Sequence, residues 1–422
     1  MESLRAVKGM NDILPEEMPR WHGVESQYRQ ITARYGYSEI RTPLVEPTSL
    51  FVRSIGDTTD IVEKEMYTFV DKGDQSLTLR PEGTASAVRA YIEHTVWARH
   101  PVAKWIYVGP MYRRERPARG RYRQFYQLGA EIFGDPGPHA DAELIEMLLS
   151  FLHEAGARDL EVLVNSLGGP DTRPRYRKAL VDYLGPHRAR LCGDCQRRLD
   201  TNPLRILDCK VPADAELAAG APPMLDFLAD DDRVHFESVL ATLRALGVPH
   251  TVAPHLVRGL DYYTRTLFEV KGRGGDLGAQ NTICGGGRYD GLVQALGGPA
   301  TPAIGFALGI ERILAMSPEA VTGPVLDVFV VCTSTGLREA TAVLLRDLRA
   351  AGLAADADLR GSSMKSQMRR ADKTGARAAI IVGDDEMSRD AVQVRDLERK
   401  EQSEVPRNQA VAAVAQMARR GS

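Results

Sequence analysis

The chain has 422 residues, of which 43% are hydrophobic and 26% charged, a composition typical of packed globular proteins rather than of disordered or fibrous ones. Its 54 Lys and Arg residues nearly balance its 56 Asp and Glu residues, and the formal net charge of −2 excludes a protein that binds polyanions through bulk positive charge. No apolar run approaches the roughly 18 residues of a membrane-spanning helix. We therefore expect a soluble cytoplasmic protein of two or three domains, with no membrane attachment and with its five cysteines reduced.

The first part of the chain predicts strands and helices that follow one another without repeating βαβ units. Apolar residues recur at helical spacing between Pro15 and Tyr35, and Pro43 indicates a strand edge, a strand start or an interface. In chain order we predict a helix over 15–35, a strand over 38–45, a strand over 75–80, a helix over 85–93, a strand over 105–112 and a helix within 134–151. This order indicates an α+β domain around an antiparallel sheet.

The second part of the chain contains two changes of texture. From about residue 169 the sequence becomes helical and charged, and sheet-like sequence resumes at Leu256, so we interpret 170–249 as an insertion in a domain over 1–322. The turn signal at 322–324 predicts a linker. Residues 325–422 are expected to form a separate α/β domain. Its predicted strands cover 326–331, 354–359, 378–382 and 391–397, and its predicted helices cover 337–351, 363–373 and 408–420.

Residues 111–133 carry the strongest indication of chemistry. A loop at 117–120 predicts that the flanking strands pair as an antiparallel hairpin. Alternation along the second strand then separates two faces. One is mostly apolar, with Gln124 as the exception, and contains Tyr122, Tyr126, Leu128, Ala130 and Ile132. The other contains Arg121, Arg123, Phe125, Gln127, Gly129 and Glu131.

Along the second face, the residue types follow one another as they would along the path of a bound ligand. Arginines suit a polyphosphate, Phe125 could stack on a base, and Gly129 would leave space for the ligand. Glu131 could receive a positive or N–H-bearing group. Arg113 and Glu115 add charges at matching positions of the opposing strand. The alternative, which the pattern leaves open, is a half-exposed hairpin with a solvated polar face.

Two further clusters follow residue 255. Arg258 and Asp261 stand among bulky apolar residues, so either they pair with each other or they serve a ligand. Residues 284–292 and 304–314 are rich in glycine, which permits close backbone approach, and Arg312 falls in the first turns of a predicted helix. The chain contains neither GxxxxGK[ST] nor GxGxxG, so a nucleotide would have to be held by side chains on a sheet.

Cysteines in the expected insertion raise the question of a zinc site. Cys192 and Cys195 have the spacing of one zinc knuckle, with Cys209 and His187 nearby. Because a second paired half is missing, ordinary thiols are the favoured interpretation, and we predict no metal ligand.

Together the clusters resemble the motifs of class II aminoacyl-tRNA synthetases. Residues 36–51 resemble motif 1, which forms the dimer interface, 113–133 resemble motif 2 and 304–314 resemble motif 3. The segments that resemble the bacterial-type histidyl-tRNA synthetases specifically are 79–84, 256–264 and 285–291. The resemblance covers essentially the whole chain. It implies a class II catalytic domain with a helical insertion, followed by a C-terminal α/β anticodon-binding domain of the class IIa type.

The resemblance also implies roles for individual residues. For ATP, it assigns Arg113 to the α-phosphate, Glu115 to the adenine amino group, Phe125 to stacking under adenine, and Arg121 and Arg312 to the terminal phosphates. For histidine, it assigns Glu82, Thr84 and Gln127 to the α-amino group, Arg113 to the carboxylate, and Glu131 and Tyr263, beside Tyr262, to the imidazole. Arg258 matches the family's catalytic arginine.

The implied activity is a histidine–tRNA ligase that acts as a homodimer. It would activate L-histidine with ATP, with Mg²⁺ bound to the ATP, and transfer histidine to the 3′ end of tRNA(His). The alternative is a histidine-binding regulatory subunit of ATP phosphoribosyltransferase, which typically lacks the C-terminal domain and has a degraded active site. Because the arginines and the last domain are present, the ligase interpretation is favoured. The helix predicted over 363–373 has a basic face that contains Arg369, Arg370 and Lys373. This face either contacts tRNA phosphates or is simply exposed to solvent.

Overall fold

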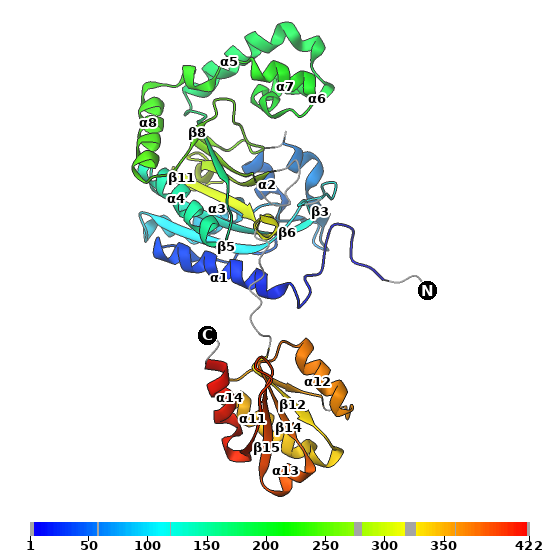
Figure 1. Cartoon of the computed structure of the whole chain (residues 1–422). Helices are drawn as coiled ribbons and strands as arrows, with labels where there is room; N and C mark the ends of the chain where they lie inside the picture. The colour runs from blue at the N-terminus through cyan, green and yellow to red at the C-terminus, as the bar shows by residue number, and fades with distance from the viewer. Residues whose placement is uncertain are drawn as a thin grey trace. The chain divides into compact units, whose positions relative to one another are not determined.

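The computed structural model describes residues 4–56, 59–118, 120–273, 281–316, 326–358 and 360–419. The chain divides into two compact units, Met1–Ala320 and Val321–Ser422, and each has its own sheet (Figure 1). The linker predicted at 322–324 and Arg119 of the predicted loop lie outside the described residues. Within the described ranges, no helix combines the length and the apolar character needed to cross a membrane.

The first unit is built on an eight-stranded sheet. Its strands are β1 (Ser38–Glu39), β5 (Ala103–Tyr112), β6 (Gln124–Phe133), β7 (Leu160–Ser166), β8 (Thr251–Val252), β9 (Thr264–Gly272), β10 (Thr282–Arg288) and β11 (Ala303–Gly309). Their spatial order is β1-β5-β6-β11-β10-β9-β7-β8. The central pairs are antiparallel, as predicted, whereas β1 with β5 and β7 with β8 pair in parallel. The sheet is therefore mixed, with an antiparallel centre.

Helices cover both faces of this sheet. Leu128, Ala130 and Ile132 of β6 point into the larger core, which confirms the alternation predicted for that strand. The helices that share this core are α1 (Met18–Arg34), α4 (Pro138–Glu154), α8 (Asp230–Ala245) and α10 (Ile310–Met316). A second core, around Tyr107 and Phe133, includes α3 (Thr84–Glu93) and α9 (Leu292–Ala295).

A smaller sheet of three strands completes the part of the first unit before residue 100. It consists of β2 (Val45–Pro47), β3 (Tyr67–Val70) and β4 (Ser76–Leu79), with α2 (Thr48–Ile55) after β2. The prediction of one strand over 38–45 is wrong, because β1 ends at Glu39 and β2 begins at Val45, each in a different sheet. Pro43 lies between them, where its missing N–H interrupts no ladder.

The segment predicted as an insertion is helical. Figure 1 shows three of its helices grouped together: α5 (Thr172–Leu184), α6 (Gly193–Thr201) and α7 (Pro212–Ala219). The short 3₁₀ segment η4 (Pro203–Asp208) connects α6 to α7. The last helix, α8, instead packs with α4, since Phe236, Val239 and Leu243 are buried in the main core.

The second unit is an α/β structure, as predicted. Its strands are β12 (Val328–Cys332), β13 (Ala355–Ala357), β14 (Ala378–Val382), β15 (Ala391–Asp396) and β16 (Gln402–Pro406), in the order β13-β12-β14-β15-β16. Strand β12 pairs in parallel with β13 and β14, whereas β14 with β15 and β15 with β16 pair antiparallel. Helices α11 (Arg338–Ala350) and α14 (Ala410–Arg419) share one core, and α12 (Met364–Lys373) another. The sequence did not predict β16 or the short helix α13 (Asp384–Ser388).

Candidate active site

A pocket with about 950 Å³ of unfilled space, part of it open to solvent, lies against β6, β10 and β11 of the large sheet. All the site residues predicted from the sequence line it except Glu131. The predicted residues in its wall are Glu82, Thr84, Arg113, Glu115, Arg121, Phe125, Gln127, Arg258, Tyr262, Tyr263 and Arg312.

The hairpin of β5 and β6 supplies one wall of the pocket. Phe125 and Gln127 line it from the face of β6 opposite the main core, as the alternation predicts. The alternation fails before the strand begins at Gln124. Arg123 is therefore not in the wall and donates to the carbonyls of Glu115 at 3.2 Å and Lys8 at 3.3 Å, while Tyr122 lines the pocket instead.

Cationic side chains gather at this wall. Arg113 donates from Nε to the carbonyl of Pro81 at 2.9 Å, and its guanidinium lies 5.3 Å from the centre of the Phe125 ring. Arg121 forms an ion pair with Glu115 at 3.3 Å. Burial lowers the pKa of Arg312, and the positive charge of Arg121 lowers it further. A bound anion would relieve this mutual repulsion.

Arg258 approaches the pocket from the loop before β9. It donates from Nη1 to Glu269 at 2.7 Å, so its ion partner is a strand carboxylate rather than Asp261. Asp261 accepts a hydrogen bond from Asn202 at 2.8 Å. A Cβ atom at Gly285 would lie 2.3 Å from the Arg258 guanidinium. The glycine of β10 therefore makes room for the arginine itself.

Glu131 lies behind the pocket wall and is completely buried. Its carboxylate accepts hydrogen bonds from the hydroxyls of Thr84 at 2.8 Å, Tyr107 at 3.1 Å and Tyr289 at 2.5 Å. Burial raises the pKa of Glu131 to about 8, although these hydroxyls oppose the shift. The prediction that Gly129 leaves space for a ligand is wrong, since a Cβ there would lie 2.1 Å from the Tyr107 ring.

The start of α3 forms a polar corner of the pocket. Glu82 accepts the backbone N–H groups of Thr84 at 2.7 Å and Ala85 at 2.8 Å, and burial raises the pKa of its carboxyl group. Gln127 is buried, and its Oε1 has no hydrogen-bond partner among the described residues. A buried acceptor without a donor is rare in proteins. The arrangement fits a ligand that brings N–H groups.

The sequence did not predict that Tyr107 and Tyr289 belong to this region. Tyr107 carries no local signal, and Tyr289 lies in the motif 285–291, which by itself indicates no role for this residue. Its ring lies 5.6 Å from that of Tyr262. Glu311 also lines the pocket, accepts the N–H of Tyr126 at 2.9 Å, and has its pKa raised by burial to about 7.

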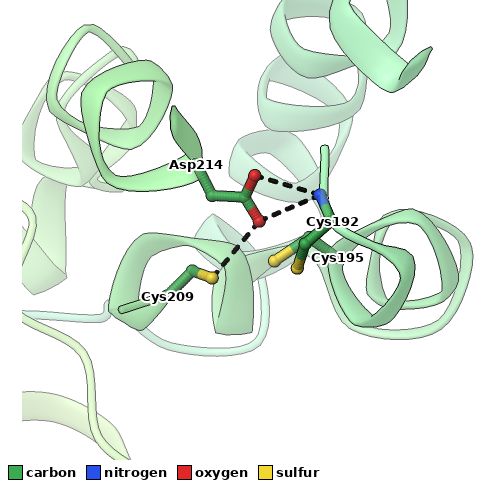
Figure 2. Close-up of side chains that lie close together, drawn as sticks. All are labelled: Cys192, Cys195, Cys209 and Asp214. Carbon is green, nitrogen blue, oxygen red and sulfur yellow. Dashed lines mark hydrogen bonds between the residues drawn. The ribbon is translucent and has the colours of Figure 1, made fainter. Parts of the chain in front are cut away.

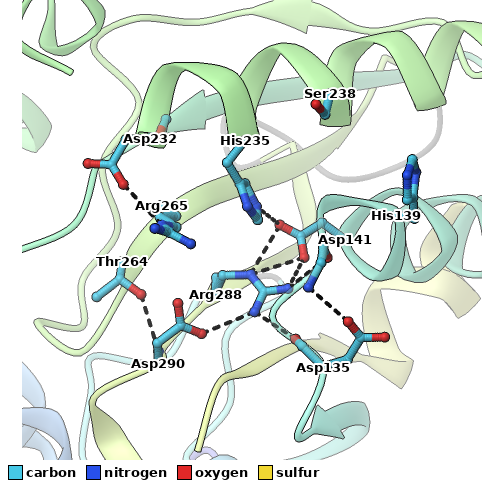
Figure 3. Close-up of polar contacts among 12 residues, drawn as sticks. Asp135, His139, Asp141, Asp232, His235, Ser238, Thr264, Arg265, Arg288 and Asp290 are labelled. Carbon is cyan, nitrogen blue, oxygen red and sulfur yellow. Dashed lines mark hydrogen bonds and ion pairs between the residues drawn. The ribbon is translucent and has the colours of Figure 1, made fainter. Parts of the chain in front are cut away.

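A second polar cluster is centred on Arg288, at the end of β10 (Figure 3). Arg288 and Asp141 are both completely buried and form an ion pair. His235 shares the same carboxylate at 2.9 Å. Arg288 also donates to Asp290 at 3.1 Å and to the carbonyls of Asp135 at 2.9 Å and Gly137 at 3.1 Å. This cluster ties α4 and α8 to the sheet.

Comparisons with known proteins agree with this architecture. The family model described as histidyl-tRNA synthetase matches residues 9–168 and 214–313, and the anticodon binding domain model matches 327–417. A histidine–tRNA ligase of Sorangium cellulosum is 53% identical over 415 residues, covering 98% of this chain and 97% of the relative.

Solved structures show the same relationship. The apo histidyl-tRNA synthetase of S. aureus has a TM-score of 0.83 and 38% identity, covering 98% of this chain and all of that one. A structure from Bacillus halodurans, described as an ATP phosphoribosyltransferase regulatory subunit/histidyl-tRNA synthetase, has a TM-score of 0.60 and 25% identity, covering 83% of this chain and 91% of that one.

Proposed function

This chain belongs to the histidyl-tRNA synthetase family, and we propose that the pocket on its large sheet is where histidine and ATP react. The protein is a histidine–tRNA ligase: it activates L-histidine with ATP as histidyl-adenylate and transfers histidine to the 3′ end of tRNA(His). One observation carries the location. One pocket joins four arginines, the half-buried ring of Phe125 and the buried Oε1 of Gln127, which has no hydrogen-bond donor among the described residues.

The arginine wall is the proposed ATP end of the pocket. Phe125 stacks under adenine, with Glu115 at the adenine amino group. Arg113 binds the α-phosphate, and Arg121 and Arg312 bind the terminal phosphates. These roles are supported by the convergence of the side chains on one wall and by the pKa of Arg312, which burial and the charge of Arg121 lower.

The corner around α3 is the proposed amino-acid end. Glu82, Thr84 and Gln127 hold the α-amino group, and the unpartnered Oε1 of Gln127 supports this assignment. Tyr263, beside Tyr262, receives the imidazole, and Glu131, which lies behind the wall, acts on it through the hydroxyls of Thr84 and Tyr289 that line the pocket. The carboxylate of Glu131 is surrounded by hydroxyl groups, and we propose that Tyr289, which donates one of these hydrogen bonds, orients this carboxylate. A site that pairs both ring nitrogens rejects analogues lacking them by about 10⁴-fold or more.

The first chemical step needs no general base from the protein. The histidine carboxylate is already a nucleophile at neutral pH, attacks the α-phosphorus in line, and displaces pyrophosphate. Catalysis then consists mainly of positioning and of neutralising charge on the pentavalent transition state. Arg113 and Arg258, whose guanidinium groups line the pocket, supply this positive charge.

Magnesium is proposed to enter with ATP. It takes oxygen ligands and usually binds through phosphates and one or two carboxylates. Glu311, in the wall next to Arg312, offers such a carboxylate, so the residues present fit the ion. When bound, Mg²⁺ neutralises charge on the β- and γ-phosphates, and Arg121 and Arg312 hold the same phosphates from the protein side.

A homodimer is supported by apolar residues of the small sheet. Leu44, Val45, Phe69 and Val70 are exposed in the single chain and belong to, or adjoin, β2 and β3. Exposed apolar residues on one small sheet are typical of interaction surfaces. We propose that a second copy covers them, and light scattering of the purified chain tests whether it forms a dimer.

The division of labour along the chain follows from the same family. We propose a catalytic domain over 1–322, an insertion within 170–249 that approaches the acceptor stem, and an anticodon reader over 325–422. Because α8 packs in the main core, the separately packed part of the insertion is the group α5 to α7. We propose a cytoplasmic location, which fits the histidine–tRNA ligases that the chain resembles.

The experiment that tests the assignment is ATP–pyrophosphate exchange with each of the twenty amino acids. We expect exchange with histidine alone, and a loss of about 10²- to 10³-fold in Arg258→Ala, by analogy with other transition-state charge donors. Arg188→Ala is the matched control, since Arg188 is exposed and pairs with Asp200. Histidine binding without exchange would instead support the regulatory-subunit alternative.

A further inference from the structure

Four side chains of the insertion converge on one point (Figure 2). The sulfur atoms of Cys192, Cys195 and Cys209 and a carboxylate oxygen of Asp214 all lie within 4.8 Å of one another. Cys195 and Asp214 are completely buried. His187, which the sequence placed near the cysteines, is not in this group, and its ring packs against Tyr183 at 6.1 Å.

The elements around the cluster present the four groups from three separate segments. Cys192 immediately precedes α6, Cys195 lies in the first turn of α6, Cys209 follows η4, and Asp214 lies in the first turn of α7. Cys192 and Cys195 thus form half of a four-ligand site, and Cys209 and Asp214 complete it. The sequence pattern concealed this because the fourth group is neither cysteine nor histidine.

The contacts of Asp214 show what the cluster lacks. Its carboxylate accepts the N–H of Cys192 at 3.0 Å and the S–H of Cys209 at 3.2 Å. Within the described part of the chain, no basic side chain forms a salt bridge with this completely buried carboxylate. Burying an anion without a counter-charge is costly. A cation at the centre of the four groups would supply that charge.

We propose that Cys192, Cys195, Cys209 and Asp214 bind one zinc ion in a closed structural site. Thiolate sulfur and carboxylate oxygen are zinc ligands, and four protein ligands without an open position characterise structural rather than catalytic zinc. Thiolates also select against magnesium and calcium, which prefer oxygen. On binding, Zn²⁺ replaces the three thiol protons, which pass to solvent.

The site has a consequence for the pocket, which rests on the proposed function. The segment between Cys195 and Cys209 contacts the loop that carries Arg258. Asn202 donates to Asp261 at 2.8 Å, and Arg205 donates to the carbonyl of Arg258 at 3.2 Å. A bound zinc ion holds both ends of this segment together. The zinc ligands are therefore positioning residues for Arg258 as well as supports of the insertion.

Metal analysis of the full chain, purified without chelators, tests the site. We expect one zinc per chain, and after exchange for Co²⁺ we expect the thiolate-to-cobalt charge-transfer band and the visible bands of tetrahedral cobalt. Asp214→Asn and Cys195→Ser should lose most of the metal. Cys332→Ser, which changes a buried cysteine of the other unit, should keep it. Five titratable thiols without metal, or a disulfide among the cluster cysteines, would overturn the proposal.

Reversible removal of zinc tests the link to Arg258. A strong chelator should lower the melting temperature and lower kcat of histidine-dependent exchange at least tenfold, with little change in KM for ATP, and added zinc should restore both. Because zinc content is measured independently of activity, failure of the proposed function cannot be confused with failure of the site. Unchanged kcat in zinc-free protein would overturn the link to Arg258.

Discussion

Arg288 and the arginines of the pocket belong to the same unit but use their guanidinium groups in opposite ways. All three nitrogens of Arg288 donate to acceptors within the protein. Arg113, Arg258 and Arg312 each donate one hydrogen bond to another described residue. An arginine whose donors are all used holds the chain together, whereas one with donors to spare is prepared for a ligand.

The largest expected effect is on the buried member of this comparison. Arg288→Met leaves Asp141 buried and without its main counter-charge, so we expect the free energy of unfolding to fall by about 3–5 kcal/mol. Denaturant titration monitored by circular dichroism measures the change. Arg34→Met, which removes an exposed ion pair with Glu154, is the control and should cost little. A loss as small as that of the control would mean that the buried cluster is not a structural support.

The opposite behaviour is expected of the pocket. Arg113→Ala removes a guanidinium aimed at the α-phosphate, and we expect a fall of about 10²- to 10³-fold in histidine-dependent exchange. Among the described residues it donates one hydrogen bond, to Pro81, so we expect little change in the melting temperature. Arg34→Ala again serves as control. If the melting temperature of Arg113→Ala fell as far as that of Arg288→Met, the distinction between the two kinds of arginine would fail.

The sequence could not distinguish these two kinds of arginine. It placed Phe125 and Gln127 on the pocket face because alternation along a strand is fixed by the backbone. The same rule misplaced Arg123, which precedes β6 although its carbonyl still accepts the N–H of Arg113 at 2.9 Å. Strand periodicity therefore predicts a face only within the regular strand. The ion partner of Arg258, Glu269, depends on the pairing of separate segments, for which the sequence has no local signal.

The fold shows the same division between local and non-local information. Long amphipathic helices and the hairpin were predicted correctly, since their patterns repeat over several turns or residue pairs. The short elements α2, β3, α13 and β16 were missed. The roles of Glu82, Thr84 and Tyr263 came from resemblance to a family and from no pattern in the residues. The sequence could not show that the Tyr107 ring fills the space at Gly129, because this depends on where Tyr107 lies in the folded sheet.

Buried carboxyl groups extend the comparison to the pH dependence of stability. Burial raises the pKa of Glu131 from its ordinary 4.5 to about 8, so between these pH values the folded state holds a proton that the unfolded state has lost. Stability contributed by this group therefore falls as pH rises through that window, by about 1.4 kcal/mol for each pH unit at most. Glu131→Gln should flatten the decline measured by denaturant titration up to about pH 8.

Glu311 provides the matched variant. Burial raises its pKa to about 7, so Glu311→Gln should flatten the decline only below that pH. Between pH 7 and pH 8 the two variants should differ, with Glu131→Gln the flatter. Equal slopes for Glu131→Gln and the unmodified protein across the window would show that the buried carboxyl is ionised at neutral pH and that the hydroxyls of Thr84, Tyr107 and Tyr289 outweigh its burial.

The smallest expected effect extends the rule to the second unit. On α12, Arg370 donates to Asp356 at 3.3 Å and lies 5.7 Å from the Phe329 ring, whereas Arg369 and Lys373 are exposed. The rule predicts that the exposed pair, and not Arg370, contacts tRNA phosphates. Arg369→Ala combined with Lys373→Ala should lower tRNA(His) affinity a few-fold and reduce the slope of log K against log salt concentration by up to about 2.

Fluorescence anisotropy with labelled tRNA(His) at several KCl concentrations measures this slope, and Arg370→Ala is the matched control with the same loss of charge. Because Arg370 is engaged within its own unit, its removal should leave the slope unchanged and lower the melting temperature of that unit instead. An unchanged slope in the double variant would identify the basic face of α12 as a solvated surface. A slope that fell as much in Arg370→Ala would show that an arginine paired within the protein still exchanges its partner for phosphate.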